Sequence, residues 1–377
     1  MEESTCCLES LVIMENINEY QGKKVFVTGH TGFKGSWLIS VLKKIGAEIK
    51  GYSLSPYTFP SLYSEIESEL EINSVIADIN DADLLTKEIL DFQPDYIFHL
   101  AAQPLVRKSY LEPLETYQTN IIGTANVLNA VRYLKKSCAV ILITTDKVYN
   151  NIEKNYLYVE SDNLGGFDPY SSSKACAELV INSYRQSFFN LENYDNHQKA
   201  LVSVRAGNVI GGGDWSTDRL VPDIIKAIEK NRPVEIRNPN AIRPWQHVME
   251  PVLGYLKLGT LLTKEPHFYS GAWNFGPENV GNLPVIEIVN KAISIYGSGE
   301  YLIKGNSNEP HEANLLQLNI SKAKDLLKWT PKLDSAKAID LTVNWYKLFF
   351  QRSNTAFELV SDDINYYLSL FKNGKSL

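Results

Sequence analysis

Tyr170 and Lys174 are the first residues in this chain whose types and spacing suggest chemistry. Side chains four positions apart lie on the same face of a helix. A lysine ammonium beside a phenol favours the phenolate, which would make Tyr170 a usable base near neutral pH. Thr145, which follows an apolar run, could hydrogen-bond the same substrate hydroxyl. The alternative is an ordinary tyrosine and lysine exposed on a polar helix, so the surrounding motifs must decide.

A glycine-rich turn at residues 28–35 is the second feature. It reads Thr-Gly-His-Thr-Gly-Phe-Lys-Gly, a G-x-x-G-x-x-G pattern between an apolar run and a helical segment. Glycines permit a tight turn and let a pyrophosphate approach the backbone and the following helix N-terminus. Alone the pattern is weak, because an ordinary strand–helix turn also explains it. Its place at the first strand of an alternating pattern favours a dinucleotide site.

The choice between NAD and NADP depends on the residues after the second strand. A dinucleotide site usually has an acid there that binds a ribose hydroxyl, whereas this chain has Tyr-Ser-Leu-Ser at 52–55. We expect NAD, with NADP left open. Asp78, after the third strand, could contact the adenine edge, or it could cap a helix expected over 81–90.

Short apolar runs alternate with helical patterns along the first 205 residues. The expected strands are Val25–Thr28, Ile49–Ser53, Val75–Ala77, Tyr96–Leu100, Val140–Ile143 and Leu201–Val204, and the expected helices include Trp37–Ile45 and Val127–Leu134. Continuous apolar strands between helices indicate a parallel sheet covered on both faces. The fold class is therefore α/β, a Rossmann-type doubly wound parallel sheet that binds ligands at the carboxyl ends of its strands.

The sequence pattern changes after Arg205, where glycines and prolines divide the chain into shorter segments. This indicates a smaller C-terminal substrate-binding lobe. The expected divisions are a disordered leader at 1–20, a dinucleotide-binding domain at 21–206 with returning segments near 242–275, a lobe at 207–241 and 276–350, and an appendix beyond the core at 351–377. Within the appendix, 364–371 could be helical.

Composition excludes several classes of protein. The 377 residues carry a formal charge of -7, which argues against non-specific binding to nucleic acid or anionic membrane. The four cysteines form no metal-ligand pattern and no disulfide framework, which predicts no metal site and a reducing cytoplasmic location. No apolar run reaches the roughly 18 residues of a membrane span, and the N-terminus lacks the basic segment of a signal peptide.

Together with the glycine turn and the Tyr170–Lys174 motif, four further segments resemble the extended short-chain dehydrogenase/reductase family: 99–103, 144–149, 205–215 and 243–248. The resemblance runs from about Gly22 to about Tyr346. Within the family, the chain most resembles the nucleotide-sugar 4,6-dehydratases that act on CDP-glucose. This implies a nucleotide-sugar substrate, an internally recycled NAD and a homodimer.

The same resemblance implies catalytic roles for Asp146 and Lys147. Oxidation of the sugar at C4 makes the C5 proton acidic, and dehydration then needs a base for that proton and an acid for the 6-hydroxyl. By analogy Asp146 is the acid and Lys147 the base, although the better-known dTDP-glucose relatives have Asp-Glu. A lysine abstracts a proton only as the neutral amine, so Lys147 is either the base with a lowered pKa or an electrostatic stabiliser of the enolate. A non-catalytic surface pair is the alternative.

The remaining site residues follow from these motifs. The expected catalytic set is Thr145, Asp146, Lys147, Tyr170 and Lys174, and the expected cofactor site is Gly29, Thr31, Gly32, Phe33, Lys34, Gly35, Asp78, Ile79, Leu100, Ala101, Ala102, Tyr170 and Lys174. For the substrate we expect Gln103, Asn208, Arg219 and Arg243, since guanidinium groups match phosphate oxygens. The resemblance supports Asn208 and Arg243 more than Arg219.

Two rival functions share much of this pattern. A nucleotide-sugar 4-epimerase would use Tyr170, Lys174 and Thr145 but has no need of the Asp146–Lys147 pair. A non-catalytic dinucleotide-binding regulator need not keep Tyr170 and Lys174 together. For the expected homodimer, the helix through Ala177, Leu179 and Val180 offers an apolar face, which core packing would explain equally well.

Overall fold

A seven-stranded parallel sheet forms the centre of the protein, whose computed structural model describes residues 16–278, 283–304 and 315–372. The strand order is β11-β7-β5-β4-β1-β2-β3. The bounds are β1 (Lys24–Thr28), β2 (Glu48–Ser53), β3 (Asn73–Ile76), β4 (Tyr96–His99), β5 (Cys138–Ile143), β7 (Lys199–Ala206) and β11 (Gly271–Phe275). This order confirms the predicted doubly wound fold. Strands β1 to β3 are added toward one edge of the sheet and β4 to β11 toward the other, so the switch point lies between β1 and β4, where such sheets open a ligand crevice.

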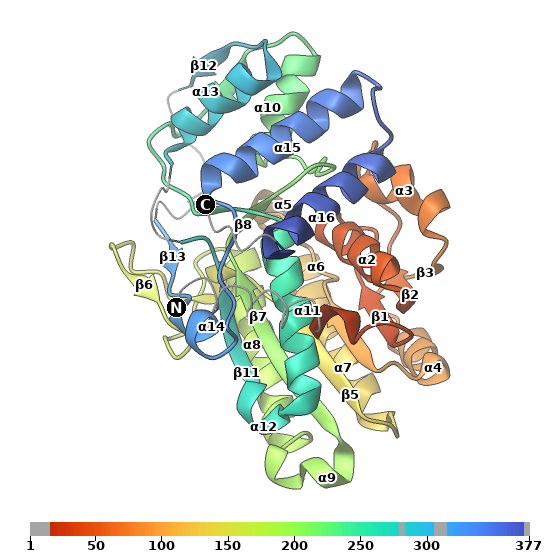
Figure 1. Cartoon of the computed structure of the whole chain (residues 1–377). Coiled ribbons are helices and arrows are strands. Elements are labelled where there is room, and N and C mark those ends of the chain that lie inside the picture. Colours follow the sequence, from red (N-terminus) through yellow and green to blue (C-terminus); the bar gives the residue numbers. More distant parts are fainter. Residues whose placement is uncertain (1–15, 279–282, 305–314, 373–377) are drawn as a thin grey trace, which may run out of the picture.

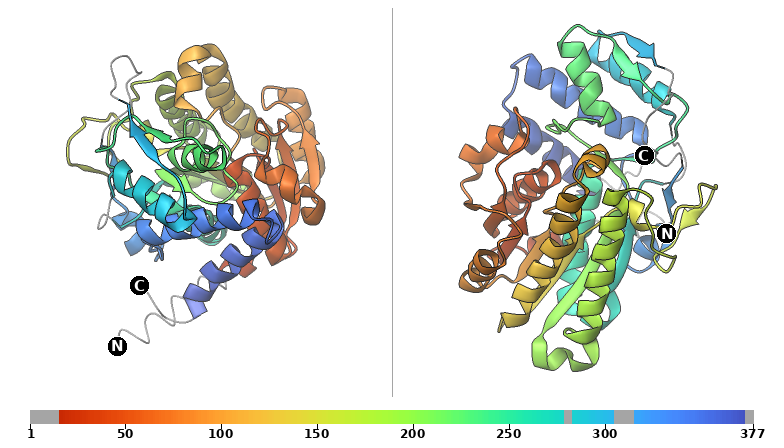
Figure 2. Two further views of the ribbon diagram at one scale, coloured as in Figure 1. Left: turned by 90° about the horizontal axis from the view of Figure 1, so that it is seen from above. Right: turned by 180° about the vertical axis from the view of Figure 1, so that it is seen from behind.

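Helices cover both faces of the sheet (Figures 1 and 2). One face carries α2 (Phe33–Ile45), α3 (Leu62–Leu70) and α11 (Met249–Lys264), and the other carries α4 (Ala82–Phe92), α7 (Gly123–Tyr133) and α8 (Pro169–Ser187). All six residues of β5 are buried. A strand between two helical layers has no solvent face, which explains why the strands read as continuous apolar runs.

Short elements connect the sheet to the region above it. After β4 the chain forms α5 (Val106–Leu111), α6 (Pro113–Tyr117) and a π-helical turn at Gln118–Ile122, all against α8. After β5 come a 3₁₀ turn (Asp146–Val148) and β6 (Leu157–Tyr158). A 3₁₀ turn (Leu191–Asn193) and α9 (Tyr194–His197) precede β7, and α12 (Pro266–Tyr269) precedes β11.

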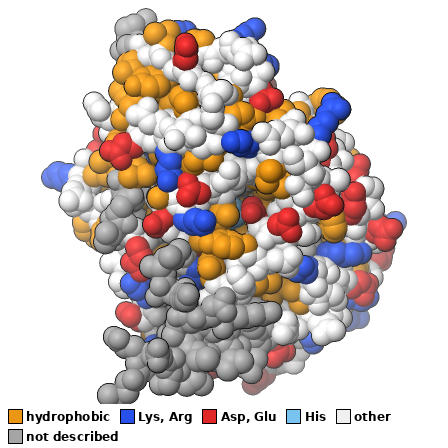
Figure 3. Space-filling model, turned by 45° about the horizontal axis from the view of Figure 1, so that its top comes forward, with side chains coloured by type: hydrophobic (Ala, Val, Ile, Leu, Met, Phe, Trp, Pro, Cys, Tyr) orange, Lys and Arg blue, Asp and Glu red, His pale blue; other side chains and the backbone are white. Residues whose placement is uncertain are grey.

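The second lobe lies beyond the carboxyl ends of the strands, at the top of Figure 1. It contains α10 (Leu220–Glu229), β9 (Val234–Ile236), α13 (Val285–Tyr296), β12 (Tyr301–Ile303) and α15 (Ser335–Phe350), with β12 paired to β9. Figure 3 shows hydrophobic side chains gathered over this lobe. Below it, β8 (Asn208–Ile210) pairs with β10 (Trp245–His247).

One part of the predicted lobe lies elsewhere. β13 (Gln317–Leu318) pairs with β6, and α14 (Ser321–Asp325) contacts β11 at the edge of the main sheet. Asn274 of β11 anchors this segment by donating from Nδ2 to the Asn319 carbonyl at 3.2 Å. The range 276–350 is therefore divided between the lobe and the sheet edge.

Both ends of the described chain pack more tightly than the sequence indicated. Tyr20 is buried and its hydroxyl donates to the Leu256 carbonyl at 2.9 Å, so a disordered leader is wrong for residues 16–20, while residues 1–15 lie outside the described part. The C-terminal helix α16 (Ala356–Lys372) packs on α2 and α3 and buries Ile364 and Tyr367. The appendix therefore belongs to the core, because its apolar residues recur at helical spacing. No helix in the described ranges is long and apolar enough to cross a membrane.

Candidate active site

A cavity of about 1650 Å³ lies between the sheet and the upper lobe. Every residue that the sequence assigned to catalysis, cofactor or substrate lines it. The lining comes from the carboxyl ends of β1, β4, β5 and β7 and from α10 and β9 of the lobe. The sheet topology therefore brings together motifs that are far apart in the chain.

The glycine turn fits a dinucleotide phosphate. Gly29 has a φ of +74°, and a Cβ there would lie 2.6 Å from the Ala101 nitrogen. A Cβ at Gly35 would lie 2.1 Å from the Gly29 carbonyl oxygen. Both positions exclude larger residues, and the helix α2 that follows has no side-chain cap at Gly32. Its first amide groups therefore remain available for an anion.

At the adenine end of the expected cofactor site, the two interpretations of Asp78 can now be separated. Asp81, not Asp78, caps α4 by accepting from the Leu84 nitrogen at 3.0 Å. Asp78 lines the cavity and accepts from the Asn80 backbone nitrogen at 2.9 Å. Thr31 is held inward, since its hydroxyl donates to the Leu54 carbonyl at 2.8 Å. Asp78 therefore remains a candidate for cofactor contact, whereas the Thr31 side chain anchors the turn.

Tyr170 and Lys174 both lie in α8 at the cavity wall. Lys174 Nζ donates to the Ile143 carbonyl at 2.9 Å, and burial lowers the pKa of Lys174 to about 8. Burial raises the pKa of Tyr170, opposed first by the charge of Lys147 and then by a hydrogen bond with Thr145. The cation that most favours the phenolate is therefore Lys147, which corrects our expectation that Lys174 does this, and the phenol is protonated near neutral pH.

Asp146 and Lys147 form the turn that follows β5. Asp146 Oδ1 accepts from Thr145 Oγ1 at 2.9 Å and lies 3.4 Å from Lys147 Nζ. Burial would lower the pKa of Lys147, but Asp146 and Tyr170 outweigh it, and the pKa is raised. The resting amine is therefore charged. A neutral Lys147 requires that its proton first be passed on.

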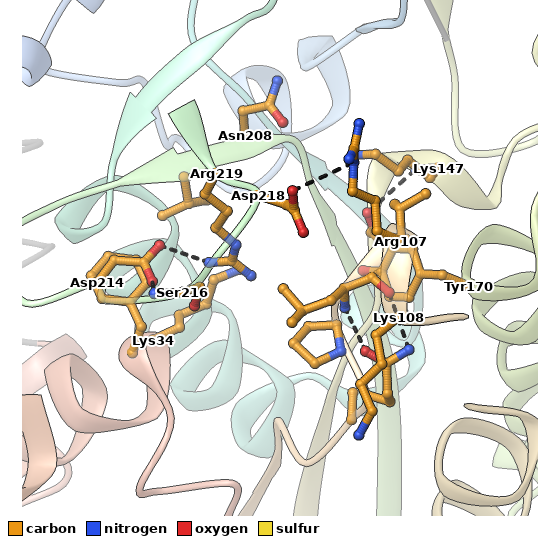
Figure 4. Close-up of a pocket in the computed structure, with 18 of the residues that line it drawn as sticks. Lys34, Arg107, Lys108, Lys147, Tyr170, Asn208, Asp214, Ser216, Asp218 and Arg219 are labelled. Atoms are coloured by element: carbon orange, nitrogen blue, oxygen red, sulfur yellow. Dashed lines mark hydrogen bonds and ion pairs between the residues drawn. The ribbon is translucent and has the colours of Figure 1, made fainter. Parts of the chain in front are cut away.

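Cations for a diphosphate project into the middle of the cavity (Figure 4). Arg219 Nη1 binds Asp214 Oδ2 at 2.8 Å, and the Arg219 side chain is about one-third exposed. Arg243 and Asn208 line the same cavity from the segments around β10 and β8. The guanidinium groups supply fixed positive charge, as phosphate recognition requires.

Gln103 lines the cavity, and its side-chain amide is hydrogen-bonded within the protein. Its Nε2 donates to Thr116 Oγ1 at 2.8 Å, and its Oε1 accepts from the Leu105 nitrogen at 2.7 Å. Asn120 completes this cluster by donating from Nδ2 to Ser173 Oγ at 2.8 Å. Gln103 therefore holds its own loop, Asn120 ties this cluster to α8, and a substrate contact of Gln103 stays a prediction.

Two features were not predicted from the sequence. Lys34, expected only at the cofactor, also interacts electrostatically with the catalytic residues: burial, together with the charges of Arg219 and Lys174, lowers its pKa to about 7. Behind the site, Glu178 forms a buried ion pair with Arg205 at 2.9 Å. Glu178 lies one helical turn after Lys174, and that spacing was the available signal.

Comparison with known proteins places this architecture among nucleotide-sugar enzymes. The family model described as GDP-mannose 4,6 dehydratase matches residues 26–342. A curated relative from Salmonella typhimurium, named CDP-glucose 4,6-dehydratase, is 47% identical over 334 residues, 89% of this chain and 93% of that protein.

Solved structures share the fold. An epimerase from Methanothermobacter thermautotrophicus superposes with a TM-score of 0.77 at 23% identity, covering 90% of this chain and 96% of its own. A dTDP-glucose 4,6-dehydratase from Streptomyces venezuelae, solved with NAD bound, gives a TM-score of 0.73 at 21% identity, covering 86% and 97%. With more than three-quarters of its residues matched by the family model, the chain belongs to the GDP-mannose 4,6 dehydratase family.

Proposed function

We propose that this chain is an NAD-dependent CDP-glucose 4,6-dehydratase, which converts CDP-glucose to CDP-4-dehydro-6-deoxyglucose and water. The observation that carries the reaction type is the Asp146–Lys147 pair beside Tyr170 in the cavity that contains the glycine turn. A 4-epimerase would need Tyr170 but not the pair. The 47% identical relative supports CDP-glucose as the substrate.

The reaction begins at the C4 hydroxyl of the glucose. When bound at the glycine turn, NAD would supply the hydride acceptor for C4 and the hydride donor for C6, so that it would be regenerated in each turnover. The phenolate of Tyr170, the minor form because burial raises its pKa, takes the hydroxyl proton, while Thr145 orients the hydroxyl. Lys147 supplies most of the positive charge that favours this phenolate, and Arg219 adds a smaller contribution.

Loss of water follows from a proton shared within the Asp146–Lys147 pair. The 3.4 Å separation allows Lys147 to pass its proton to Asp146 once the substrate excludes water, because desolvation disfavours two separate charges. The neutral amine of Lys147 then takes the C5 proton, and the protonated Asp146 gives its proton to the departing 6-hydroxyl. The pair returns to its starting charges when the water has left. Hydride return to C6 then requires a proton at C5, and the Tyr170 phenol, which gained a proton from the C4 hydroxyl, is its source, so Tyr170 ends the cycle as the phenolate.

Product analysis tests this proposal. Protein incubated with NAD and CDP-glucose should form a 4-keto-6-deoxy sugar, detected by its absorbance in alkali. Turnover of UDP-glucose or dTDP-glucose in place of CDP-glucose would contradict the substrate and leave the reaction type intact. Formation of CDP-galactose without loss of water would identify an epimerase, and cofactor binding without any turnover would identify a regulator.

A homodimer formed through α6 and α8 is part of the proposal. These helices contact each other, and Figure 2 shows this side of the molecule from behind. Leu111 and Leu114 are each 82% exposed and Leu179 is 59% exposed, whereas Ala177 is buried. Exposed apolar clusters commonly mark interfaces. Light scattering should show a dimer for the wild type and a monomer for the Leu114→Glu, Leu179→Glu double variant.

We place the enzyme in the reducing cytoplasm. Cys138 and Cys176 are both free thiols, and proteins from oxidising compartments more often pair theirs.

A further inference from the structure

The cavity continues past the catalytic residues into the upper lobe. There it is lined by residues of α10 and β9, among them Asp223, Lys226 and Val234. The glycine turn takes the cofactor, and Tyr170 and Asp146 take the hexose. The nucleoside of a nucleotide sugar must therefore lie beyond the diphosphate, at the α10–β9 end.

Asp223 differs from the other acids at this end. Three of them carry ion pairs with basic side chains: Asp214 with Arg219, Asp218 with Arg107 and Arg237, and Glu235 with Lys304. Within the described ranges, the Asp223 carboxylate makes no hydrogen bond and no ion pair. It is the acid at this end with both oxygens available to a ligand.

The surroundings of Asp223 make an unused carboxylate costly. The residue is half-buried, and burial raises its pKa to about 6, against the opposing charge of Lys226. Lys226 directs its ammonium elsewhere and donates to the Trp215 carbonyl at 2.6 Å. A partly desolvated acid without a donor loses the hydrogen bonds that water would give it. A ligand that offers an N–H group would restore them.

The pyrimidine bases differ in what they offer. Cytosine presents its exocyclic amine as a donor, and a carboxylate accepts from it, whereas uracil and thymine present the O4 oxygen, which a carboxylate repels. We propose that Asp223 recognises the exocyclic amine of cytosine and thereby selects cytidine nucleotides over uridine and thymidine nucleotides. This inference rests on the proposed function, because it assumes that a nucleotide sugar occupies the cavity.

Asp223 also lies in the first turn of α10, where an acid stabilises the helix dipole. That role acts on folding and would not distinguish one base from another. Nucleotide selectivity, measured as the ratio of two dissociation constants, therefore separates recognition from stabilisation.

The test measures binding of CDP and UDP to the NAD-loaded protein by calorimetry. In Asp223→Asn, the affinity for CDP should fall about 10- to 100-fold and that for UDP should stay or improve, so the CDP-to-UDP preference collapses. The kcat at saturating CDP-glucose should stay within about twofold, since a contact at the base is remote from the chemistry. Asp223→Ser, which also removes the charge, should lose the preference similarly.

Glu229→Gln is the matched control, because Glu229 lies on the same helix outside the cavity and bonds the Tyr296 hydroxyl. It should keep the wild-type preference. Equal losses for CDP and UDP in Asp223→Asn would overturn the proposal in favour of helix stabilisation. Wild-type protein that binds UDP as tightly as CDP would overturn it as well. Because binding is measured without turnover, an inactive protein that still prefers CDP would contradict only the proposed reaction.

Discussion

Two acid–base pairs are bonded by the neighbouring threonines Thr144 and Thr145 after β5, and they are built in opposite ways. Glu178 and Arg205 are 2.9 Å apart, and both side chains are 4% exposed. Asp146 and Lys147 are 3.4 Å apart, and the Lys147 side chain is 33% exposed. The first pair is closed to solvent and ligand, whereas the second opens on the cavity.

Hydrogen bonding explains why the two pairs differ in their ability to exchange protons. Glu178 accepts from Thr144 at 2.6 Å, from Ser203 at 2.7 Å and twice from Arg205, so its oxygens are fully occupied. Thr145, the next residue, donates instead to Asp146. Neighbouring threonines thus serve a fixed pair and a reactive pair. The Glu178–Arg205 pair has no spare acceptor, so it cannot exchange protons with a substrate. Through Thr144 it can instead fix the end of β5, which the Asp146–Lys147 pair follows.

Asp146→Asn should have the largest effect on the reactive pair. An amide cannot deliver the proton to the 6-hydroxyl, so dehydration should slow by about 10²- to 10⁴-fold. Oxidation at C4 should persist and be visible as reduced cofactor absorbance and a 4-keto-glucose product. Dehydration at the wild-type rate would show that Asp146 is not the acid.

Glu178→Gln should have the largest effect on the fixed pair. It leaves the Arg205 charge buried without a counter-charge, which costs about 3–5 kcal/mol of unfolding free energy. Urea unfolding measures this loss. Glu229→Gln, on an exposed surface, should change it by no more than about 0.5 kcal/mol. A loss as small as that of the control would remove the distinction between the two pairs.

Substitutions of Lys147 distinguish a proton-transfer role of this residue from electrostatic stabilisation. Lys147→Gln should slow dehydration by about 10²-fold or more. Lys147→Arg keeps the cation but cannot give up its proton, so a proton-sharing role predicts that it is as slow as the glutamine variant. Exchange of the C5 hydrogen with deuterated solvent, followed by NMR, reports the step directly. Retention of most activity in the arginine variant would support electrostatic stabilisation instead.

The smallest expected effect is in the pH dependence of stability. Burial would raise the pKa of Glu178, but Arg205 and the hydroxyl donors outweigh it and hold the pKa below the ordinary 4.5. A depressed pKa stabilises the folded state above the ordinary value, and this contribution is lost as pH falls below about 4.5 through the lower folded value. Thermal unfolding between pH 7 and 3 should therefore show a steeper loss for the wild type than for Glu178→Gln. Parallel curves would contradict this assignment.

Local patterns predicted much of the fold. The β5 strand is a continuous apolar run, and a strand of that composition predicts a layer of helices on each face of the sheet. The glycine turn was predicted because its spacing reports backbone geometry, which Gly29 and Gly35 confirm. The ion pair of Glu178 could not be predicted, since Arg205 lies on β7 and only the β5–β7 pairing brings it near. The packing of α16 on α2 was likewise a long-range result.

By itself, the sequence determined the parallel α/β class, the glycine turn and the Tyr170–Lys174 motif, because strand hydrophobicity, glycine spacing and helical spacing are local properties. Only the tertiary structure decided what each side chain does there. It directed the Gln103 side chain toward its own loop and set Lys147 rather than Lys174 as the main cation favouring the Tyr170 phenolate. It also left the Asp223 carboxylate without a hydrogen bond or ion pair among the described residues. Burial and charge proximity depend on neighbours from distant segments, and those neighbours exist only in the folded chain.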